Sequence, residues 1–344
     1  MHKTIIVTIL AAALAVPAWA QLPPVPAPMG VPQPGPAARS GAYQPQPILP
    51  GGIVMPLFAA DSPFLNAKRV REAEVYTMDA AVPGRIAQIV NIHNPSIEVH
   101  LAGAGNNTGT AIILAPGGGH TTLVVGLEGA DPVPFFFEYG INTIILRNRL
   151  KRDGYNPKTD EVYDIQQAIR LVRAHAGEWH IDPHKIGVAG FSAGAELTMA
   201  AAISYPDFDA KNNAPGDPLA GITSRPDFVG AIYPGPSLFT KGGAPAIPKD
   251  APPSFIAGAG WQDKVHAVWA SEYFSAMLNA GVPNVEMHIY ARGKHGGGLS
   301  YRDFTGEGTW QDRFTGWLRD LGFFQKPGMA TLAASDVADF AKQP

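Results

Sequence analysis

The chain has 344 residues, of which 46% are hydrophobic and 16% are charged, a composition that excludes a wholly disordered protein. The formal net charge of −3 offers no basic field for nucleic acid or anionic membranes, so a small molecule or a polymer is the favoured partner. Cysteine is absent, which excludes disulfides, thiolate metal sites and a catalytic thiol.

Residues 1–20 have the pattern of a secretory signal peptide. Lys3 precedes an apolar run at residues 5–16, and residues 18–20 (Ala-Trp-Ala) match a cleavage site. A membrane anchor is the alternative, but the run is short for a bilayer and Pro17 interrupts it. We therefore expect a secreted or periplasmic protein that has no membrane anchor after cleavage.

Residues 21–56 are rich in proline, which alternates with glycine, alanine and glutamine. Proline lacks the N–H that a helix or a central strand requires, so this segment is predicted to be an extended linker. Docking of the segment into an aromatic-lined groove is a less favoured alternative. We expect the main domain at residues 57–326, with order beginning near Val70. The apolar residues of the tail at 327–344 could pack on the domain or stay loose.

The domain is predicted to begin with two antiparallel strands at residues 86–92 and 97–101, because Asn94-Pro95 between them is typical of a turn. From residue 111 onward, apolar strands alternate with amphipathic helices. Strands are predicted at 111–115, 142–146, 186–189, 229–233, 255–257 and 285–290, and helices at 132–139, 161–175, 193–202, 267–280 and 309–321. This alternation predicts an α/β fold with a doubly wound, mostly parallel sheet that has helices on both faces.

Ser192 is the first candidate for the functional site, because ligands bind where the strands of such a sheet end. It lies in Gly190-Phe191-Ser192-Ala193-Gly194, where a predicted strand becomes a helix. The sharp turn needs small neighbours, which Gly190 and Gly194 supply. It would expose the hydroxyl of Ser192 as a nucleophile. The pentapeptide alone is a modest signal, since common residues match it by chance.

Asp263 and His295 also follow predicted strands, and they come after Ser192 in the chain. A serine hydroxyl needs a base in contact with it, and a carboxylate that fixes the tautomer of that base. The order Ser192, Asp263, His295 is expected for a doubly wound sheet with an early nucleophile. We therefore predict that these three residues form a catalytic triad.

The glycine run at residues 117–119 follows the first parallel strand. The oxyanion that forms on an attacked carbonyl needs preorganised N–H donors, and glycine amides have no side chain to obstruct a substrate. We assign these donors to Gly118 or Gly119 together with Ala193. A phosphate-binding loop is the alternative, but the Lys-Ser/Thr ending of such a loop is missing.

Three other side chains could belong to the site. His120 could contact the substrate or shape its own loop, and a role in shaping the loop is favoured. Trp261 could line the cleft, although a tryptophan at a strand end more often packs inside the protein. Glu196 lies one helical turn beyond Ser192 and is expected to be a satisfied polar residue, because the triad already has a base.

Four motifs carry a resemblance to a known family: APGGGH, GEWHIDPHKIGVAGFSAG, QDKV and YARGKHGGGL. Over about residues 86–322 the chain resembles the α/β-hydrolases, and within them it is similar to the esterases that include acetylxylan and feruloyl esterases and to lipases with a glycine-rich oxyanion loop. Pro116 stands where many such lipases have histidine, and Glu196 also departs from the pattern. The resemblance implies a serine ester hydrolase.

Substrate size is suggested by residues 203–229 and 233–255, which are polar or rich in proline and glycine and do not resemble an apolar helical lid. Their composition favours short acyl groups on accessible substrates. Together with export, the resemblance implies removal of acetyl groups from a carbohydrate such as xylan through an acyl-enzyme on Ser192. We expect no cofactor and no metal ion. A serine peptidase of the same fold and a non-catalytic carbohydrate-binding relative remain the alternatives.

Overall fold

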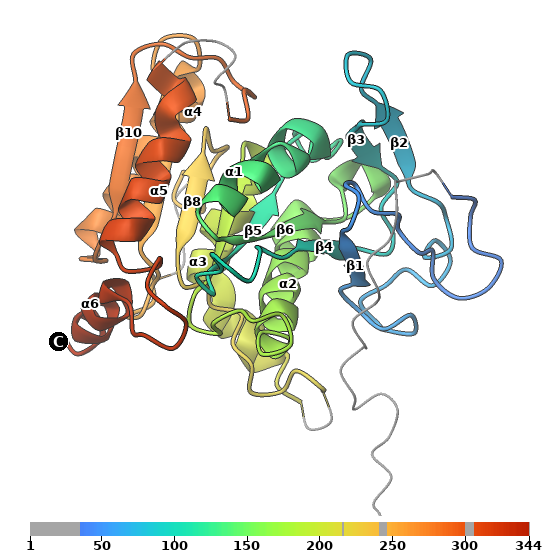
Figure 1. The fold of residues 1–344 in the computed structure, drawn as a ribbon, viewed down its shortest axis with the longest axis horizontal. Helices are drawn as coiled ribbons and strands as arrows, with labels where there is room; N and C mark the ends of the chain where they lie inside the picture. Colours follow the sequence, from blue (N-terminus) through green and yellow to red (C-terminus); the bar gives the residue numbers. More distant parts are fainter. Residues whose placement is uncertain (1–34, 215–216, 241–245, 300–305, 344) are drawn as a thin grey trace, which may run out of the picture.

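The computed structural model describes residues 35–214, 217–240, 246–299 and 306–343. The predicted signal peptide and the first part of the predicted linker therefore lie outside the described residues. The described chain is built on one eight-stranded sheet (Figure 1). In spatial order its strands are β1 (Ile53–Pro56), β4 (Ser96–His100), β6 (Asn142–Arg147), β5 (Ala111–Ala115), β7 (Ile186–Phe191), β8 (Val229–Ile232), β9 (Ser254–Ala259) and β10 (Glu286–Tyr290).

The strands from β6 through β10 run parallel to one another, whereas β4 is antiparallel to both of its neighbours. Every residue of β5, β6 and β7 is buried, which explains why these strands are almost continuously apolar rather than alternating. The predicted α/β class with a doubly wound, mostly parallel sheet is confirmed.

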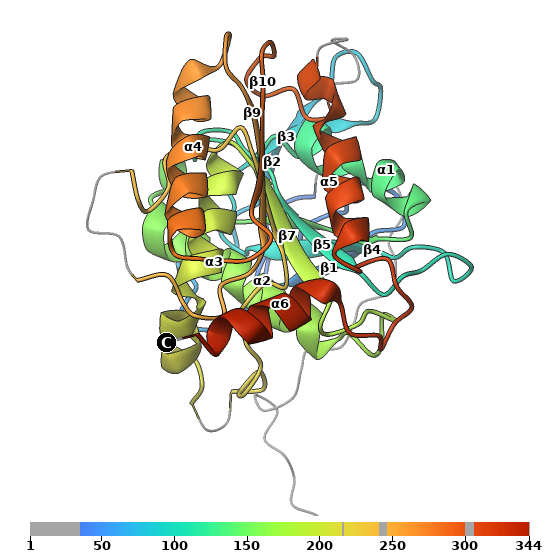
Figure 2. The same ribbon diagram turned by 90° about the vertical axis from the view of Figure 1, so that its left-hand side faces the viewer.

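Helices cover both faces of the sheet (Figure 2). On one face lie α2 (Val162–Ala174), α3 (Ala193–Lys211) and α4 (Lys264–Asn279), and on the other lie α1 (Pro132–Glu138) and α5 (Trp310–Asp320). Each face has its own apolar core, with an aliphatic cluster under α2 and α3 and an aromatic cluster under α1 and α5. The described chain also contains the short helices η2 (Gly126–Ala130), η3 (Lys151–Asp153), η4 (Pro157–Glu161) and η6 (Gly306–Thr309).

The predicted antiparallel pairing of residues 86–92 with 97–101 is wrong, although both strands exist. The first is β3 (Ile86–Val90), which pairs with β2 (Val75–Met78) in a separate two-stranded sheet. The second is β4, which is buried along its whole length and therefore lies between two neighbours in the large sheet. Strand β2 was not predicted, because its residues are mostly exposed and lack a clear apolar alternation.

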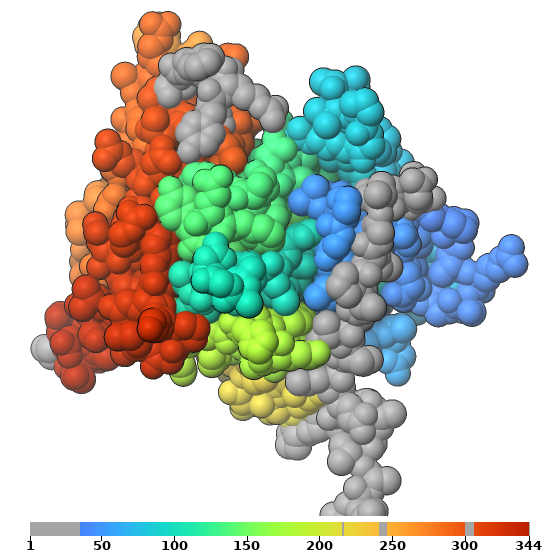
Figure 3. Space-filling view, in the orientation of Figure 1, coloured from blue at the N-terminus to red at the C-terminus, as the bar shows by residue number. Residues whose placement is uncertain are grey.

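The second half of the predicted linker is also not a spacer, and order begins well before Val70. Tyr43, Ile48 and Leu57 are buried, and β1 completes the edge of the large sheet. The prolines are compatible with this because β1 is an edge strand, where a missing N–H costs no ladder bond. This N-terminal segment and the C-terminal helices occupy opposite ends of the face shown in Figure 3.

A buried ion pair joins this segment to the sheet. The guanidinium of Arg147 donates to Glu98 at 2.8 Å and to the backbone carbonyl of Gln46. The carboxylate of Glu98 in turn accepts from the amides of Ile48 and Leu49. The charges of Arg147 and Glu98 are therefore satisfied by backbone groups of the segment as well as by each other.

The C-terminal tail packs on the domain, which decides between the two alternatives for it. Helix α6 (Leu332–Ala341) buries Ala333, Val337 and Phe340 and lies across one end of the sheet (Figure 2). No helix in the described part of the chain is long and apolar enough to cross a bilayer.

Replacing Arg147 with Met should lower the free energy of unfolding by about 3–5 kcal/mol, because the buried carboxylates of Glu98 and Glu74 would both lose their guanidinium partner. Guanidinium unfolding followed by circular dichroism measures this. Lys342→Met is the matched control, because its ion pair with Asp339 is exposed and should not matter. Equal unfolding midpoints for the Arg147 variant and the wild type would show that the pair does not anchor the segment.

Candidate active site

Ser192 lies on a strained turn between β7 and α3. Its φ of 52° and ψ of −118° are rare for a residue with a side chain. The turn is possible because its neighbours are glycines. A Cβ on Gly190 would lie 2.3 Å from the carbonyl oxygen of Gly194, and one on Gly194 would lie 2.0 Å from that of Ala115. The backbone here is too close to its surroundings for any larger residue.

The structure brings the three residues predicted for a triad into one hydrogen-bonded chain. The hydroxyl of Ser192 lies 2.8 Å from Nε2 of His295, and Nδ1 of His295 lies 2.9 Å from Oδ2 of Asp263. Asp263 is the N-cap residue of α4 and lies shortly after the end of β9, and His295 follows β10. The fold positions all three at the carboxyl ends of parallel strands.

Asp263 is an ionised carboxylate. Burial alone would raise its pKa, but hydrogen bonds from His266 and His295 outweigh burial and lower the pKa to about 2. A negative charge next to Nδ1 favours the tautomer of His295 that has its proton on that nitrogen. Nε2 is then free to accept the proton of Ser192.

His266 is a member of this cluster that the sequence analysis missed. Its Nδ1 contacts the second carboxylate oxygen of Asp263, and its ring stacks on that of His295 with 3.7 Å between ring centroids. The available signal was a histidine three residues after the acid, in the first turn of a helix. The predicted helix began at residue 267, so this spacing was not recognised, whereas α4 begins at Lys264.

The glycine loop after β5 passes directly beside Ser192, since a Cβ on Gly117 would lie 3.0 Å from Cβ of Ser192. Gly118 and Gly119 have φ values of 129° and 62°, which favour glycine. Within the described residues, no group accepts a hydrogen bond from the amides of Gly118, Gly119 or Ala193. These amides are available to an oxygen atom held near Ser192.

Glu128 and Tyr233 connect the loops around Ser192, and neither was predicted. The carboxylate of Glu128 accepts from the amide of Gly117 at 2.6 Å and from the hydroxyl of Tyr233 at 2.8 Å. Tyr233 also accepts from the amide of Gly298 at 3.0 Å, and its ring packs edge-on against His295. Burial raises the pKa of Glu128. This network joins the glycine loop to the loop that carries His295.

His120 is held between two carboxylates rather than directed into solvent. Its Nδ1 lies 2.8 Å from Glu161 and its Nε2 lies 3.4 Å from Glu196. Burial opposes a positive charge on His120, but the hydrogen bonds that His120 donates to Glu161 and Glu196 outweigh burial and raise its pKa to about 9. The imidazolium therefore fixes the end of the glycine loop, and Glu196 is a satisfied polar residue as expected.

Trp261 does not pack inside the protein. Its side chain is 76% exposed, two residues before Asp263.

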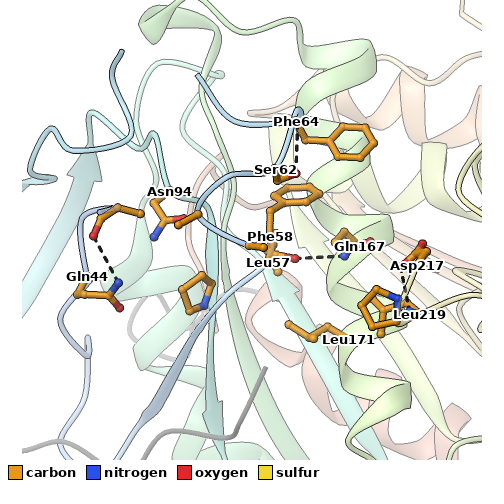
Figure 4. A pocket seen from close by; sticks show the side chains of 15 residues that line it. Gln44, Leu57, Phe58, Ser62, Phe64, Asn94, Gln167, Leu171, Asp217 and Leu219 are labelled. Carbon is orange, nitrogen blue, oxygen red and sulfur yellow. Dashed lines mark hydrogen bonds between the residues drawn. The ribbon is translucent and has the colours of Figure 1, made fainter. Parts of the chain in front are cut away.

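A cavity of about 520 Å³ lies in another part of the molecule, between the N-terminal segment and α2 (Figure 4). Phe58, Phe64 and Gln167 line this cavity, and none of the residues of the candidate site does.

The strand order, the turn at Ser192 and the positions of Asp263 and His295 define the α/β-hydrolase fold. Comparison with solved structures agrees. The chain superposes on an acetyl ester-xyloside bifunctional hydrolase from Caldicellulosiruptor lactoaceticus with a TM-score of 0.61 and 24% identity, covering 79% of this chain and 97% of that one.

Sequence comparison adds one family match and two relatives. The BD-FAE family pattern matches residues 103–218. The chain is 29% identical over 234 residues to an acetylxylan esterase of Xylanibacter ruminicola, covering 64% of this chain and 46% of that protein. It is 27% identical over 232 residues to endo-1,4-beta-xylanase B of Butyrivibrio fibrisolvens, covering 60% and 34%. The chain thus spans less than half the length of these relatives.

Tyr233→Phe should lower the free energy of unfolding by about 1–3 kcal/mol, because Glu128 and the amide of Gly298 would each lose a buried partner. Chemical unfolding measures the change. Tyr139→Phe is a control for loss of a hydroxyl from a partly buried ring elsewhere. A Tyr233 variant as stable as the wild type would contradict a structural role for the network.

The charge on His120 should make stability depend on pH in the alkaline range. Because the pKa of His120 is raised from 6.5 to about 9 in the folded protein, the charged imidazolium stabilises the fold by about 3 kcal/mol below pH 6.5. This stabilisation is lost as the pH rises through 9 and His120 loses its proton. The difference in unfolding free energy between wild type and His120→Asn should therefore shrink between pH 6 and pH 9.5. A difference that stays constant over this range would rule out a charged His120.

Proposed function

We propose that the protein is a serine ester hydrolase that forms an acyl-enzyme on Ser192. The observation that carries this proposal is the hydrogen-bonded chain from Ser192 through His295 to Asp263, beside amides that have no acceptor among the described residues. A hydroxyl, a base, an orienting carboxylate and free donors are the set of groups that acyl transfer requires.

The reaction follows from the geometry. Nε2 of His295 accepts the proton of Ser192 as its oxygen attacks the ester carbonyl, and the ionised Asp263 stabilises the imidazolium that results. The carbonyl oxygen gains a negative charge, which the amide of Ala193 and that of Gly118 or Gly119 stabilise. His295 then protonates the leaving alcohol, and a water molecule activated by the same imidazole hydrolyses the acyl-enzyme.

The proposed substrate is a short-chain ester on a carbohydrate, with acetylated xylan favoured. Two of the relatives are named an acetylxylan esterase and an endo-1,4-beta-xylanase, and the structural neighbour is named an acetyl ester-xyloside hydrolase. The described parts of the chain between α3 and β8 and between β8 and β9 hold no helix that could cover a long acyl chain.

We also propose that the enzyme acts outside the cytoplasm. The support is the signal-like pattern at residues 1–20, together with a polymeric substrate too large to enter a cell. Measuring activity in the culture medium or periplasm of a host that expresses the full chain tests this.

Ser192→Ala should reduce turnover of p-nitrophenyl acetate by at least about 10³-fold while leaving the fold intact, because the nucleophile is lost. Circular dichroism and thermal unfolding of the variant serve as the control for folding. Ser204→Ala, which changes a partly buried serine further along α3, should keep full activity. Retained activity in the Ser192 variant would contradict the proposal.

Acyl specificity is tested by p-nitrophenyl esters of increasing chain length, measured beside release of acetate from acetylated xylan. We expect kcat/KM to fall beyond butyrate, because no described segment covers a longer chain, and we expect acetate release from the polymer. An aminoacyl-nitroanilide tests the peptidase alternative and should not be cleaved. A preference for long acyl chains would contradict the proposed substrate class.

A further inference from the structure

The catalytic base shares its carboxylate with a second imidazole. Asp263, His266 and His295 each offer a ligand atom, and these three atoms all lie within 4.8 Å of one another. Nδ1 of His295 and Nδ1 of His266 approach different oxygens of Asp263, so both nitrogens face the same carboxylate. A triad needs only one imidazole, and His266 is therefore surplus to the proposed reaction.

Two imidazoles and one carboxylate are a donor set that suits Zn²⁺. Three protein ligands leave a fourth position for water, as in open zinc sites. The cluster can be reached from solvent, because the side chains of His266 and His295 are 18% and 34% exposed while Asp263 is buried beneath them.

We propose that Asp263, His266 and His295 form a binding site for Zn²⁺, and that occupation of this site switches the enzyme off. The inhibitory part rests on the proposed function. A zinc ion takes the lone pair of Nδ1 on each imidazole and a carboxylate oxygen. Each imidazole stays neutral, because its proton moves from Nδ1 to Nε2 by exchange with solvent. Nε2 of His295 then carries a proton and has no lone pair to accept the proton of Ser192.

The proposal is tested with full-length protein freed of metal by a chelator and then titrated with ZnCl₂ during turnover of p-nitrophenyl acetate. Wild-type activity should fall to a small fraction at micromolar Zn²⁺ and return when EDTA is added. MgCl₂ should have no effect, because Mg²⁺ prefers oxygen ligands.

His266→Gln should raise the half-inhibitory zinc concentration at least about 10-fold, with each protein measured against its own metal-free activity. Gln keeps a hydrogen-bond donor for Asp263 but removes the imidazole ligand. His288→Gln is the matched control, because His288 pairs with Glu286 at 2.7 Å on β10 and, within the part of the chain that the structure describes, belongs to no such cluster. It should be inhibited like the wild type.

Calorimetry separates this proposal from the proposed function. Ser192→Ala should bind one Zn²⁺ per chain even though it is inactive, and His266→Gln should bind at least about 10-fold more weakly. A wild type that binds zinc but hydrolyses no ester would support the zinc site and contradict only its inhibitory role. Absence of zinc binding by Ser192→Ala, or equal affinity in the His266 and His288 variants, would overturn the site.

Discussion

The close approach of backbone around Ser192 is the constraint on which the rest of the site depends. Because Gly190 and Gly194 have no side chain, α3 starts directly against β5 and β7, and the serine between them takes a strained conformation. Hydrogen bonds hold that conformation on both sides. The amide of Ser192 donates to Ile232, and its carbonyl accepts from Gly235. These hydrogen bonds thus keep Ser192 in its strained backbone conformation, and its hydroxyl stays exposed where the strands end.

Around this fixed point, hydrogen bonds of buried polar side chains hold the loops that carry the other residues of the site. Glu128 joins the glycine loop to Tyr233 and, through that hydroxyl, to the loop with His295. His120 fixes the other end of the glycine loop against α3 and the start of α2. The proposed oxyanion donors and the proposed base are therefore positioned before a substrate arrives, which is the condition under which electrostatic stabilisation of a transition state is effective.

The sequence was sufficient for groups whose place follows from local pattern. Ser192, Asp263 and His295 each follow an apolar strand, so a parallel sheet places them at one edge without further information. Glu128 and Tyr233 are 105 residues apart, and no local pattern relates them. The same applies to the N-terminal segment, whose prolines suggested a linker. Its order depends on Glu98 and Arg147, which lie far along the chain and become partners only in the folded sheet.

The central claim is that this architecture makes Ser192 a nucleophile, and labelling with an organophosphonate tests it most directly. The reagent imitates an ester but leaves a stable adduct, so the attacked residue can be identified by mass spectrometry of peptides. We predict one adduct per chain on Ser192, with activity lost in proportion to labelling and no adduct in Ser192→Ala. Loss of activity with the adduct on another residue, or an active enzyme with Ser192 fully labelled, would contradict the account.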